Sequence, residues 1–351
     1  MKELKNISLL PYNTFGMNAK AKLFIEYYSL DELRQVLKEH KGEQILHIGQ
    51  GSNLLFTSDF NGVILHSGMA RAKFLDDETV EAQNGLRLDD MIAQLTDMGY
   101  SGLEKLSLIP GEVGASAVQN VGAYGCEAKD VIVRVNTLNV ETLEERVFTN
   151  EECRFGYRDS IFKHELKGKY IVTSVVYKVK PGDATKTREE IIATRMAKLP
   201  TVGEVGSAGS FFMNPFVPEE KANELLAQYP DMPNFPSLQG GDRGRLVKIP
   251  AAWLIEQCGW KGKTLGGAQV WPKQPLVIVN ANNATPEDII ALAAQISASV
   301  KEKFGIDKEM VFVGKATYLE VWPAEAWDAR FGVLDPSKID KMIQDLKKYG
   351  V

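Results

Sequence analysis

The segment LIPGEVGASAVQNVGAYG, residues 108–125, restricts the fold more than any other part of the chain. Glycine, alanine and serine recur along it, so much of its backbone is covered only by small side chains. Such a backbone lets a large flat ligand lie against the main chain, and Ser116, Gln119 and Asn120 remain to hydrogen-bond the ligand's polar edges. The alternative is close packing of a helix N-terminus on a sheet. Glu112 is expected to point to solvent, because its carboxylate would repel a pyrophosphate.

A second glycine-rich loop, GQGSNLL at residues 49–55, follows a predicted strand at residues 43–48. Its glycines allow successive backbone N–H groups to turn toward one anion, as phosphate-binding nests do. A simple turn at the end of a strand is the alternative. The sequence contains neither GxGxxG nor GxxxxGKS, so an ordinary nicotinamide-binding domain or a P-loop is not supported.

Charge and cysteine usage exclude several classes of partner. The 351 residues carry a formal charge of −5, so nothing attracts nucleic acid or an anionic membrane in general, and an anionic ligand needs a local site. No apolar run is long enough for a signal peptide or a membrane span, which predicts a cytoplasmic protein. Three cysteines without a CxxC pair and four histidines without an HxxxH pair suggest neither a disulfide framework nor a metal site.

Periodicity predicts the elements of the first half. Ser29 and Glu32 suit a capping box at the start of a helix over residues 29–40, and a second helix is expected over 87–99 with Gly99 after its end. A strand is predicted at 62–65, and β-branched runs between residues 131 and 180 predict three more strands.

A break at PGDATK precedes the second half. There Thr187 and Glu190 suit the cap of a helix that Pro200 ends, and Thr285 and Pro286 suit the start of a long helix. Further elements are expected as helices at 218–229 and 250–260, strands at 275–280 and 310–314, and a helical pattern at 336–349. The expected organisation is residues 1–185, residues 186–314 and a C-terminal appendix of residues 315–351.

Eight motifs, taken together and in order, resemble those of the UDP-N-acetylenolpyruvoylglucosamine reductases, flavoenzymes that complete UDP-N-acetylmuramate for the bacterial cell wall. The resemblance covers about residues 10–314 and is carried by IGQGSNLL, LIPGEVGASAVQNVGAYG, CRFGYRDSIFKH, KLP, AGSFFMNP, AAWLIEQCGWKG, GGAQVWPKQPLVIVN and KEMVFVG. It implies an α+β protein with an FAD-binding PCMH-type (vanillyl-alcohol-oxidase-like) domain, followed by a smaller α/β substrate domain. It also implies a UDP-sugar enolpyruvyl ether as substrate and NADPH as hydride donor, and we expect a monomer.

The resemblance further implies that the two glycine loops hold FAD without a covalent bond. The implied cofactor-binding residues are Gly49, Gln50, Gly51, Ser52, Asn53, Ile109, Pro110, Gly111, Val113, Gly114, Ser116, Gln119, Asn120, Gly122, Ala123 and Tyr124.

By the family pattern, Arg158, Ser210 and Glu309 lie at the reacting centre. Arg158 is expected to be held among Phe155, Tyr157 and Phe162, shielded from water, where a guanidinium stabilises a developing enolate. A structural Arg158–Asp159 pair or an aromatic stacking contact is the alternative. The Ser210 hydroxyl is expected to donate a proton to the substrate, since a carbanion is basic enough to take it. The implied substrate-binding residues are Lys198, Asn214 and Gln274.

The match departs from the family pattern at several positions. Met213 replaces a common lysine, Trp271 stands where a histidine is frequent, and Val311 where many members have arginine. The groups that bind the diphosphate therefore stay open. Two other functions compete with the reductase: an FAD-dependent oxidase of the same superfamily, and a flavin- or sugar-nucleotide-binding module without catalysis. A histidine attached covalently to the flavin would indicate the oxidase, and the second glycine loop contains no histidine.

Overall fold

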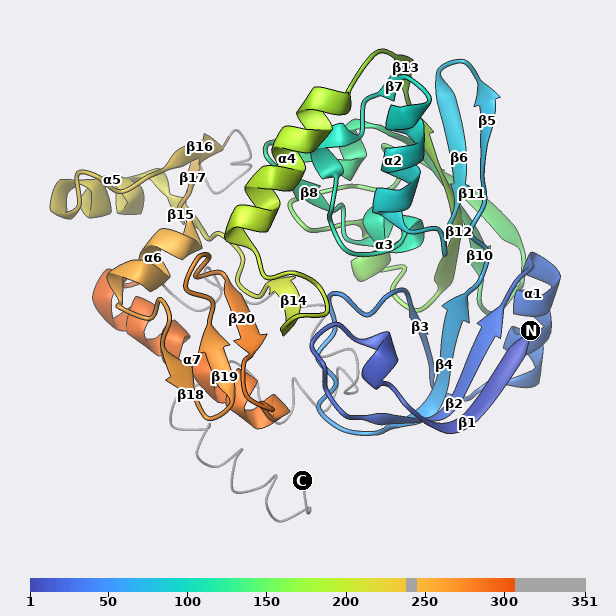
Figure 1. Ribbon diagram of the computed structural model, residues 1–351, viewed down its shortest axis with the longest axis horizontal. Coiled ribbons are helices and arrows are strands. Elements are labelled where there is room, and N and C mark those ends of the chain that lie inside the picture. Colours follow the sequence, from blue (N-terminus) through green and yellow to red (C-terminus); the bar gives the residue numbers. More distant parts are fainter. Residues whose placement is uncertain (238–244, 307–351) are drawn as a thin grey trace. The chain divides into compact units, whose positions relative to one another are not determined.

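The computed structural model describes residues 1–237 and 245–306. By its internal contacts the chain divides into two units, which are described in turn (Figure 1). The first unit comprises Met1–Tyr12, Asn18–Ser52 and Asp59–Ala197, and the second comprises Asn13–Met17, Asn53–Ser58 and the chain from Lys198 onward. The strand expected at 310–314, the helical pattern at 336–349 and the appendix 315–351 lie outside the described residues.

A four-stranded sheet with the order β1-β2-β4-β3 opens the first unit. Strands β2, β4 and β3 run parallel, and β1 pairs antiparallel with β2. Helix α1 packs its buried Leu33, Val36 and Leu37 on this sheet in one apolar cluster. The bounds are β1 (Lys2–Ser8), β2 (Lys20–Tyr27), α1 (Leu30–Glu39), β3 (Ile45–Ile48) and β4 (Phe60–Ser67).

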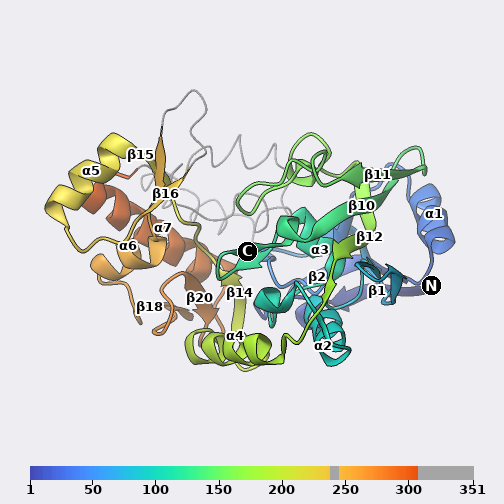
Figure 2. The same cartoon turned by 90° about the horizontal axis from the view of Figure 1, so that it is seen from above.

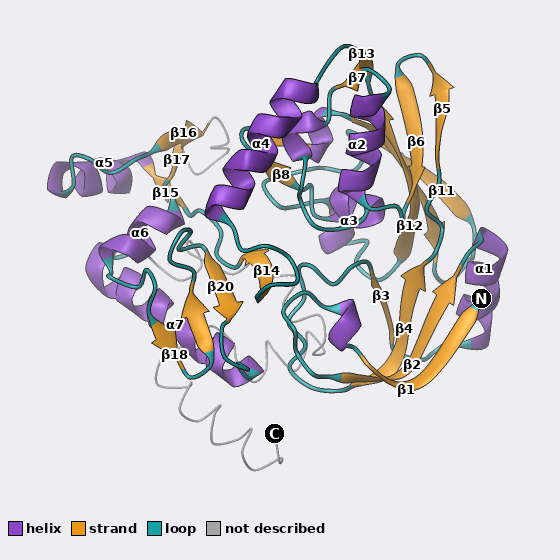
Figure 3. Ribbon diagram, viewed as in Figure 1, coloured by secondary structure: helices purple, strands orange, loops and turns teal. Residues whose placement is uncertain are grey.

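An antiparallel sheet of five strands, in the order β11-β10-β12-β6-β5, forms the rest of the first unit's framework. Helices α2 and α3 lie on one side of it (Figure 3). Helix α3 contacts β12 and lies beside this strand in the second view as well (Figure 2). The bounds are β5 (Ala72–Asp76), β6 (Thr79–Gln83), α2 (Leu88–Asp97), α3 (Val113–Val118), β10 (Ile132–Asn139), β11 (Glu145–Thr149) and β12 (Tyr170–Lys178). Shorter elements are η1 (Leu10–Tyr12), β7 (Tyr100–Ser101), η2 (Glu104–Leu106), β8 (Gly122–Ala123), β9 (Cys126–Glu127), η3 (Ala128–Asp130), η4 (Ile161–Lys163) and β13 (Lys180–Pro181).

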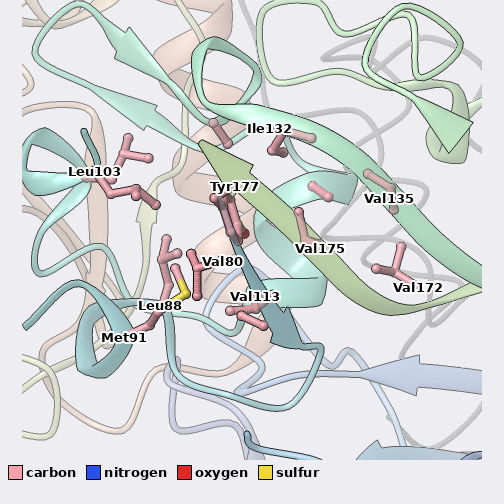
Figure 4. Close-up of a cluster of buried hydrophobic side chains, with 14 of the residues drawn as sticks. Val80, Leu88, Met91, Leu103, Val113, Ile132, Val135, Val172, Val175 and Tyr177 are labelled. Carbon is pink, nitrogen blue, oxygen red and sulfur yellow. The ribbon is translucent and has the colours of Figure 1, made fainter. Parts of the chain in front are cut away.

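The core of this unit fills the space between the five-stranded sheet and its two helices. Figure 4 shows Tyr177 of β12 among Val80, Val113 and Val175, with Leu88 and Met91 of α2 beside them. Tyr177 is fully buried, and its hydroxyl lies 2.6 Å from the Ser116 hydroxyl of α3. The aromatic ring thus supplies apolar area while its polar end is satisfied, as burial of a tyrosine requires.

Two of the three helix starts that we predicted from capping residues are confirmed. The Ser29 hydroxyl accepts the Glu32 N–H at the start of α1, and Thr285 caps α7 with Pro286 at its first position. The prediction of Thr187 as a cap is wrong. Helix α4 (Thr185–Lys198) begins earlier, where the Asp183 carboxylate accepts the Thr185 N–H at 2.9 Å.

Helix α4 belongs to the first unit over most of its length. Arg188 donates two hydrogen bonds to the Asp89 carboxylate of α2, at 2.6 and 3.2 Å. A bidentate pair of this kind fixes the position of the helix and also pairs the two opposite charges. The division by contacts therefore falls after Ala197, whereas we expected a boundary after residue 185.

The second unit contains two small antiparallel sheets, in the orders β14-β20-β19-β18 and β15-β17-β16. Helix α7 ends at Gly305, whose φ of 62° suits a glycine cap. The bounds are β14 (Gly206–Ser210), β15 (Phe216–Pro218), α5 (Glu219–Gln228), β16 (Phe235–Ser237), β17 (Leu246–Lys248), α6 (Ala251–Gln257), β18 (Thr264–Leu265), β19 (Ala268–Val270), β20 (Val277–Asn280) and α7 (Pro286–Phe304).

One buried amide joins the two sheets of the first unit. Asn84 follows β6 and is 2% exposed. Its Nδ2 donates to the Tyr27 hydroxyl of β2 at 2.9 Å and to the Val172 carbonyl of β12 at 2.7 Å, and its Oδ1 accepts the Ser67 hydroxyl of β4 at 2.7 Å. Its carbonyl accepts the Gly114 N–H of α3 at 3.0 Å. Both sheets and the second glycine loop therefore meet at this side chain.

Replacing Asn84 with alanine should destabilise the protein strongly. Asn84→Ala removes one hydrogen bond each from two buried hydroxyls and one buried carbonyl, although Tyr27 keeps His47 and Ser67 keeps Met69 as partners. The loss should lower the free energy of unfolding by about 2–4 kcal/mol. Urea unfolding followed by circular dichroism measures this. The matched control is Asn223→Ala on the exposed side of α5, which should change stability by less than about 0.5 kcal/mol. Equal stability of the two variants would contradict the role of Asn84.

Candidate active site

Hydrogen bonds between side chains and backbone connect the two glycine loops. The Gln50 side-chain oxygen accepts the Gly111 N–H at 2.8 Å, and the Ser52 hydroxyl donates to the Pro110 carbonyl at 3.1 Å. Gly51 and Gly111 have φ angles of 62° and 132°, which side-chain-bearing residues rarely adopt. The loops are thus held as one structure by residues that we had expected to contact the cofactor.

The first loop also offers hydrogen-bond donors. Within the described residues, the backbone N–H groups of Gln50, Gly51 and Ser52 have no protein acceptor. Gly51 is buried, and a buried N–H without an acceptor is unfavourable. Three consecutive donors around a glycine with positive φ suit an anion such as the pyrophosphate of FAD. The residues present therefore fit this cofactor. Asn53, the next residue and one that we also expected to bind it, belongs by its contacts to the second unit.

Several residues of the second loop serve the protein itself. The Ser116 hydroxyl contacts Tyr177 and donates to the Val113 carbonyl at 2.8 Å. Asn120 is fully buried, donates to the Gly156 carbonyl at 2.7 Å and accepts the Lys129 N–H at 2.9 Å. The expectation that these two side chains face the edge of a ligand is wrong, because their hydrogen-bonding groups are used inside the fold.

Close packing also explains two of the glycines. A Cβ on Gly114 would lie 2.9 Å from the Asn84 Cβ, and one on Gly122 would lie 2.7 Å from the Cys126 carbonyl in the β8–β9 hairpin. The alternative of helix packing on a sheet thus applies to Gly114. Val113 is buried in the core and Ile109 packs at its edge, whereas Tyr124 is 42% exposed beyond Ala123.

Glu112 does not point to solvent, contrary to our expectation. It is 5% exposed, and its Oε1 lies 3.1 Å from Nε2 of His66 on β4. The other ring nitrogen of His66, Nδ1, lies 3.0 Å from Oε1 of Glu26 on β2. An imidazole between two carboxylates offsets their charge, and this allows Glu112 to be buried.

Arg158 is held by the second glycine loop. Its guanidinium donates to the Asn120 carbonyl at 3.4 Å and to the Gly122 carbonyl, and it lies 5.3 Å from the centre of the Tyr157 ring. The stacking alternative is thus present, but Asp159 pairs with His164 instead. The side chain is 33% exposed, so the expected shielding from water is wrong for this structure. Phe162, which we expected beside Arg158, packs edge-to-face on Phe148.

Lys163 is a site residue that we did not predict. Its ammonium donates to the Arg158 carbonyl at 2.8 Å and to the Gln119 side-chain oxygen at 3.0 Å. Arg158 has a φ of 56°, an uncommon backbone conformation for a non-glycine residue, and Lys163 helps to hold it. The sequence offered only one signal for it, its position five residues after Arg158 within CRFGYRDSIFKH.

The second unit holds the other predicted site residues. Ser210 is exposed at the end of β14, opposite Val277, just after a register shift at which Gly209 has a φ of 70°. Such an irregularity turns a side chain out of the regular strand pattern. Asn214 accepts the first N–H of α6, from Ala251, at 2.9 Å. Glu309 lies outside the described residues.

Lys198 and Gln274 both lie close to Trp271 of the same unit. Lys198 is exposed, and its carbonyl accepts the Trp271 indole N–H at 3.0 Å. Gln274 closes a turn by donating its N–H to the Trp271 carbonyl at 3.2 Å. The tryptophan that replaces a frequent histidine of the family therefore connects the two residues that the resemblance assigns to the substrate.

Comparison with known proteins places both halves of the chain in one family. Residues 21–142, which contain both glycine loops, match the FAD binding domain, and residues 201–311 match the C-terminal domain of UDP-N-acetylenolpyruvoylglucosamine reductase. Proteins of that name are 46% identical in Bacteroides fragilis and 40% identical in Flavobacterium johnsoniae, over 86% and 87% of this chain and 96% and 97% of theirs.

The relative from Neisseria gonorrhoeae is 41% identical over 85% of this chain and 93% of its own. The crystal structure of UDP-N-acetylenolpyruvylglucosamine reductase from Thermus caldophilus has a TM-score of 0.65 at 23% identity, covering 88% of this chain and 97% of that one. Fold and loops define a flavoprotein of the FAD-binding PCMH type with an added C-terminal domain. The chain belongs to the UDP-N-acetylenolpyruvoylglucosamine reductase family.

Two further observations concern the described residues only. No helix within residues 1–237 and 245–306 has both the length and the apolar character that a membrane span requires. In the same ranges, no three histidine, cysteine, aspartate or glutamate side chains are grouped so that they could hold a metal ion.

Removing the side chain of Gln50 should weaken FAD binding. Gln50→Ala takes away the acceptor of the Gly111 N–H, which frees the two loops from each other and should raise the Kd for FAD about tenfold. Flavin fluorescence on dilution of the holoenzyme measures the Kd. Gln35→Ala on the exposed face of α1 is the matched control and should leave it unchanged. An unchanged Kd for Gln50→Ala would mean that this bond does not set the loop geometry.

Proposed function

We propose that this protein reduces the enolpyruvyl ether of UDP-N-acetylglucosamine enolpyruvate to UDP-N-acetylmuramate in peptidoglycan precursor synthesis, with NADPH as the electron donor. The observation that carries the proposal is the match of both halves of the chain, over 93–97% of the relatives' length, to enzymes of that name. The pair of glycine loops and the three unsatisfied N–H groups of the first loop support FAD as the cofactor.

The reaction adds a hydride to C3 and a proton to C2 of the enolpyruvyl group. FAD, when bound, would supply the hydride chemistry, with NADPH as the source of the electrons. The chain's own residues then have two tasks: they must stabilise the negative charge that spreads from C2 into the carboxylate, and they must supply the proton.

Arg158 performs the first task in this proposal. The Asn120 and Gly122 carbonyls accept from the guanidinium, and the Glu127 carboxylate lies 3.9 Å from it. A guanidinium has five N–H donors, so donors remain for a substrate carboxylate. The carbonyls and Lys163 hold the side chain and backbone in place before the substrate arrives. A preorganised cation stabilises developing charge more than a mobile one, because it does not have to reorient during the reaction.

Ser210 performs the second task. A serine hydroxyl is a weak acid, but a carbanion at C2 is a much stronger base, so the proton transfer is favourable. The exposure of Ser210 at an irregular strand end supports an outward hydroxyl. Glu309 is proposed to orient the substrate together with Arg158, and Lys198, Asn214 and Gln274 to bind it. A cytoplasmic location and a monomeric state stay predictions.

The proposed function is tested by separating the two half-reactions under anaerobic conditions. NADPH should bleach the flavin absorbance of the purified protein, and UDP-N-acetylglucosamine enolpyruvate should restore it. Flavin that NADPH reduces but this substrate does not reoxidise would overturn the proposal. If the reduced flavin stays reduced with this substrate and is reoxidised only when oxygen is then admitted, the oxidase alternative is favoured.

Replacing Ser210 with alanine should affect only the second half-reaction. Ser210→Ala should leave flavin reduction by NADPH near normal and slow reoxidation by the enolpyruvyl substrate about 10²–10⁴-fold or more, the usual effect of losing a proton donor. Ser210→Cys should recover part of the loss, because a thiol also delivers a proton. Stopped-flow absorbance measures each step. Reoxidation of Ser210→Ala at the parent rate would remove Ser210 from the mechanism.

Replacing Lys198 with alanine should also damage the enolpyruvyl half-reaction more than flavin reduction. The removed ammonium is exposed and is proposed to bind the anionic substrate, so the substrate concentration for half-maximal reoxidation should rise about tenfold or more. Lys273→Ala, a nearby exposed lysine, is the control. Equal losses in both half-reactions would instead assign Lys198 to NADPH binding or to structure.

A further inference from the structure

His66, Glu26 and Glu112 form a cluster that the proposed reaction does not use. Both ring nitrogens of His66 face carboxylate oxygens, at 3.0 Å from Glu26 and 3.1 Å from Glu112. A carboxylate only accepts hydrogen bonds, so both contacts are hydrogen bonds only if both nitrogens carry a proton. Burial raises the pKa of Glu112, but while both carboxyl groups are ionised the two contacts require a positively charged imidazolium.

The cluster lies directly against the first glycine loop. A Cβ on Gly49 would be 2.9 Å from Glu112 Oε2, so the carboxylate rests on the glycine's backbone. Glu112 also precedes α3 and follows Gly111, the residue whose N–H is bound by Gln50. One oxygen of Glu112 is thus held by His66 while the other touches the loop that offers donors to the cofactor.

We propose that His66, as an imidazolium, is a positioning residue that holds Glu112 against Gly49 and so sets the spacing of the two glycine loops for FAD. This rests on the proposed function only in taking FAD as the ligand of the loops. Neither loop contains His66, which reaches them from β4 in the middle of the four-stranded sheet.

Several other charged or titratable groups surround the cluster. Burial, and to a smaller extent the charge of His66, lower the pKa of His47 on β3 to about 3, so His47 is neutral, and the ring of Tyr12 lies edge-on at 6.3 Å. Glu26 also accepts the Tyr28 hydroxyl and interacts with Lys2, while Arg87 faces Glu112. Burial alone would lower the pKa of His66, but Glu112 and Glu26 outweigh burial and raise it.

The raised pKa of His66 sets the direction in which pH changes the stability of the cluster. A histidine whose pKa is raised in the folded state stabilises it at low pH, and the contribution disappears as the pH rises through the folded-state pKa. Above that pKa one nitrogen loses its proton, and its lone pair then faces a carboxylate. Glu112 is no longer held, and the loops lose their fixed spacing.

FAD release from the holoenzyme, measured by flavin fluorescence on dilution at pH 6.5 to 9, tests the proposal. The Kd of the parent protein should rise about tenfold across this range. His66→Gln should bind FAD more weakly than the parent at pH 6.5 and lose the pH dependence. Glu112→Gln should also lose it, because an amide can either donate to or accept from the ring. His40→Gln, which removes a surface histidine 2.9 Å from Glu43, is the matched control and should keep the parent profile.

Nitrogen-15 NMR of histidine-labelled holoenzyme provides the second readout. His66, assigned by its absence in His66→Gln, should be doubly protonated at pH 7, with a midpoint that coincides with the change in Kd. A neutral His66 at pH 7, or the parent pH profile in Glu112→Gln, would overturn the proposal, and the second outcome decides even if His66→Gln does not fold. A protein that binds no FAD at any pH would overturn the flavin assignment as well, whereas pH-independent FAD binding would overturn the positioning role alone.

Discussion

The fold of the first unit depends on the buried amide of Asn84. Two sheets with different strand arrangements meet there, one mostly parallel and one antiparallel, and no strand pairing connects them. The amide supplies a hydrogen-bonded connection through Tyr27, Ser67 and Val172. An apolar cluster that includes Leu138 and Ile171 of the antiparallel sheet packs beside it. An unsatisfied amide at this depth would be strongly unfavourable, so the arrangement is stable only when all partners are in place. Gly114 belongs to the same junction, because its missing side chain lets α3 approach Asn84.

The second glycine loop therefore has two kinds of small residue. Gly114, Gly122, Ser116 and Asn120 let the loop pack tightly on the sheet and the hairpin, or hydrogen-bond within them. Gly111 is of the second kind, because its backbone N–H donates to the Gln50 side chain of the first loop. The tightly packed residues are as important to ligand binding as direct contacts would be, because they fix where the two loops lie. Arg158 extends this logic, since its guanidinium uses two carbonyls of the loop as its support.

Local signals in the sequence predicted local structure well. The caps at Ser29 and Thr285, the long helix α7 and the strands β10, β11 and β12 depend on neighbouring residues, and the structure confirms them. The order of the motifs predicted the family. Contacts between distant residues could not be predicted in this way. Glu112 is buried because of His66 and Glu26 on other strands. Arg158 is held by two backbone carbonyls, which no residue type indicates, and by Glu127, whose carboxylate lies 3.9 Å away.

A carboxylate next to loops that bind an anionic cofactor looks unfavourable, yet the arrangement is consistent with simple electrostatics. The donors of the first loop are the N–H groups of Gln50, Gly51 and Ser52, whereas Glu112 approaches Gly49 with an oxygen whose charge His66 partly offsets. Shared between two carboxylates, the imidazolium leaves the cluster with one net negative charge, and Arg87 acts on Glu112 with the opposite sign. The repulsion on a phosphate is therefore reduced at short range, while the mechanical link between β2, β4 and both loops is kept.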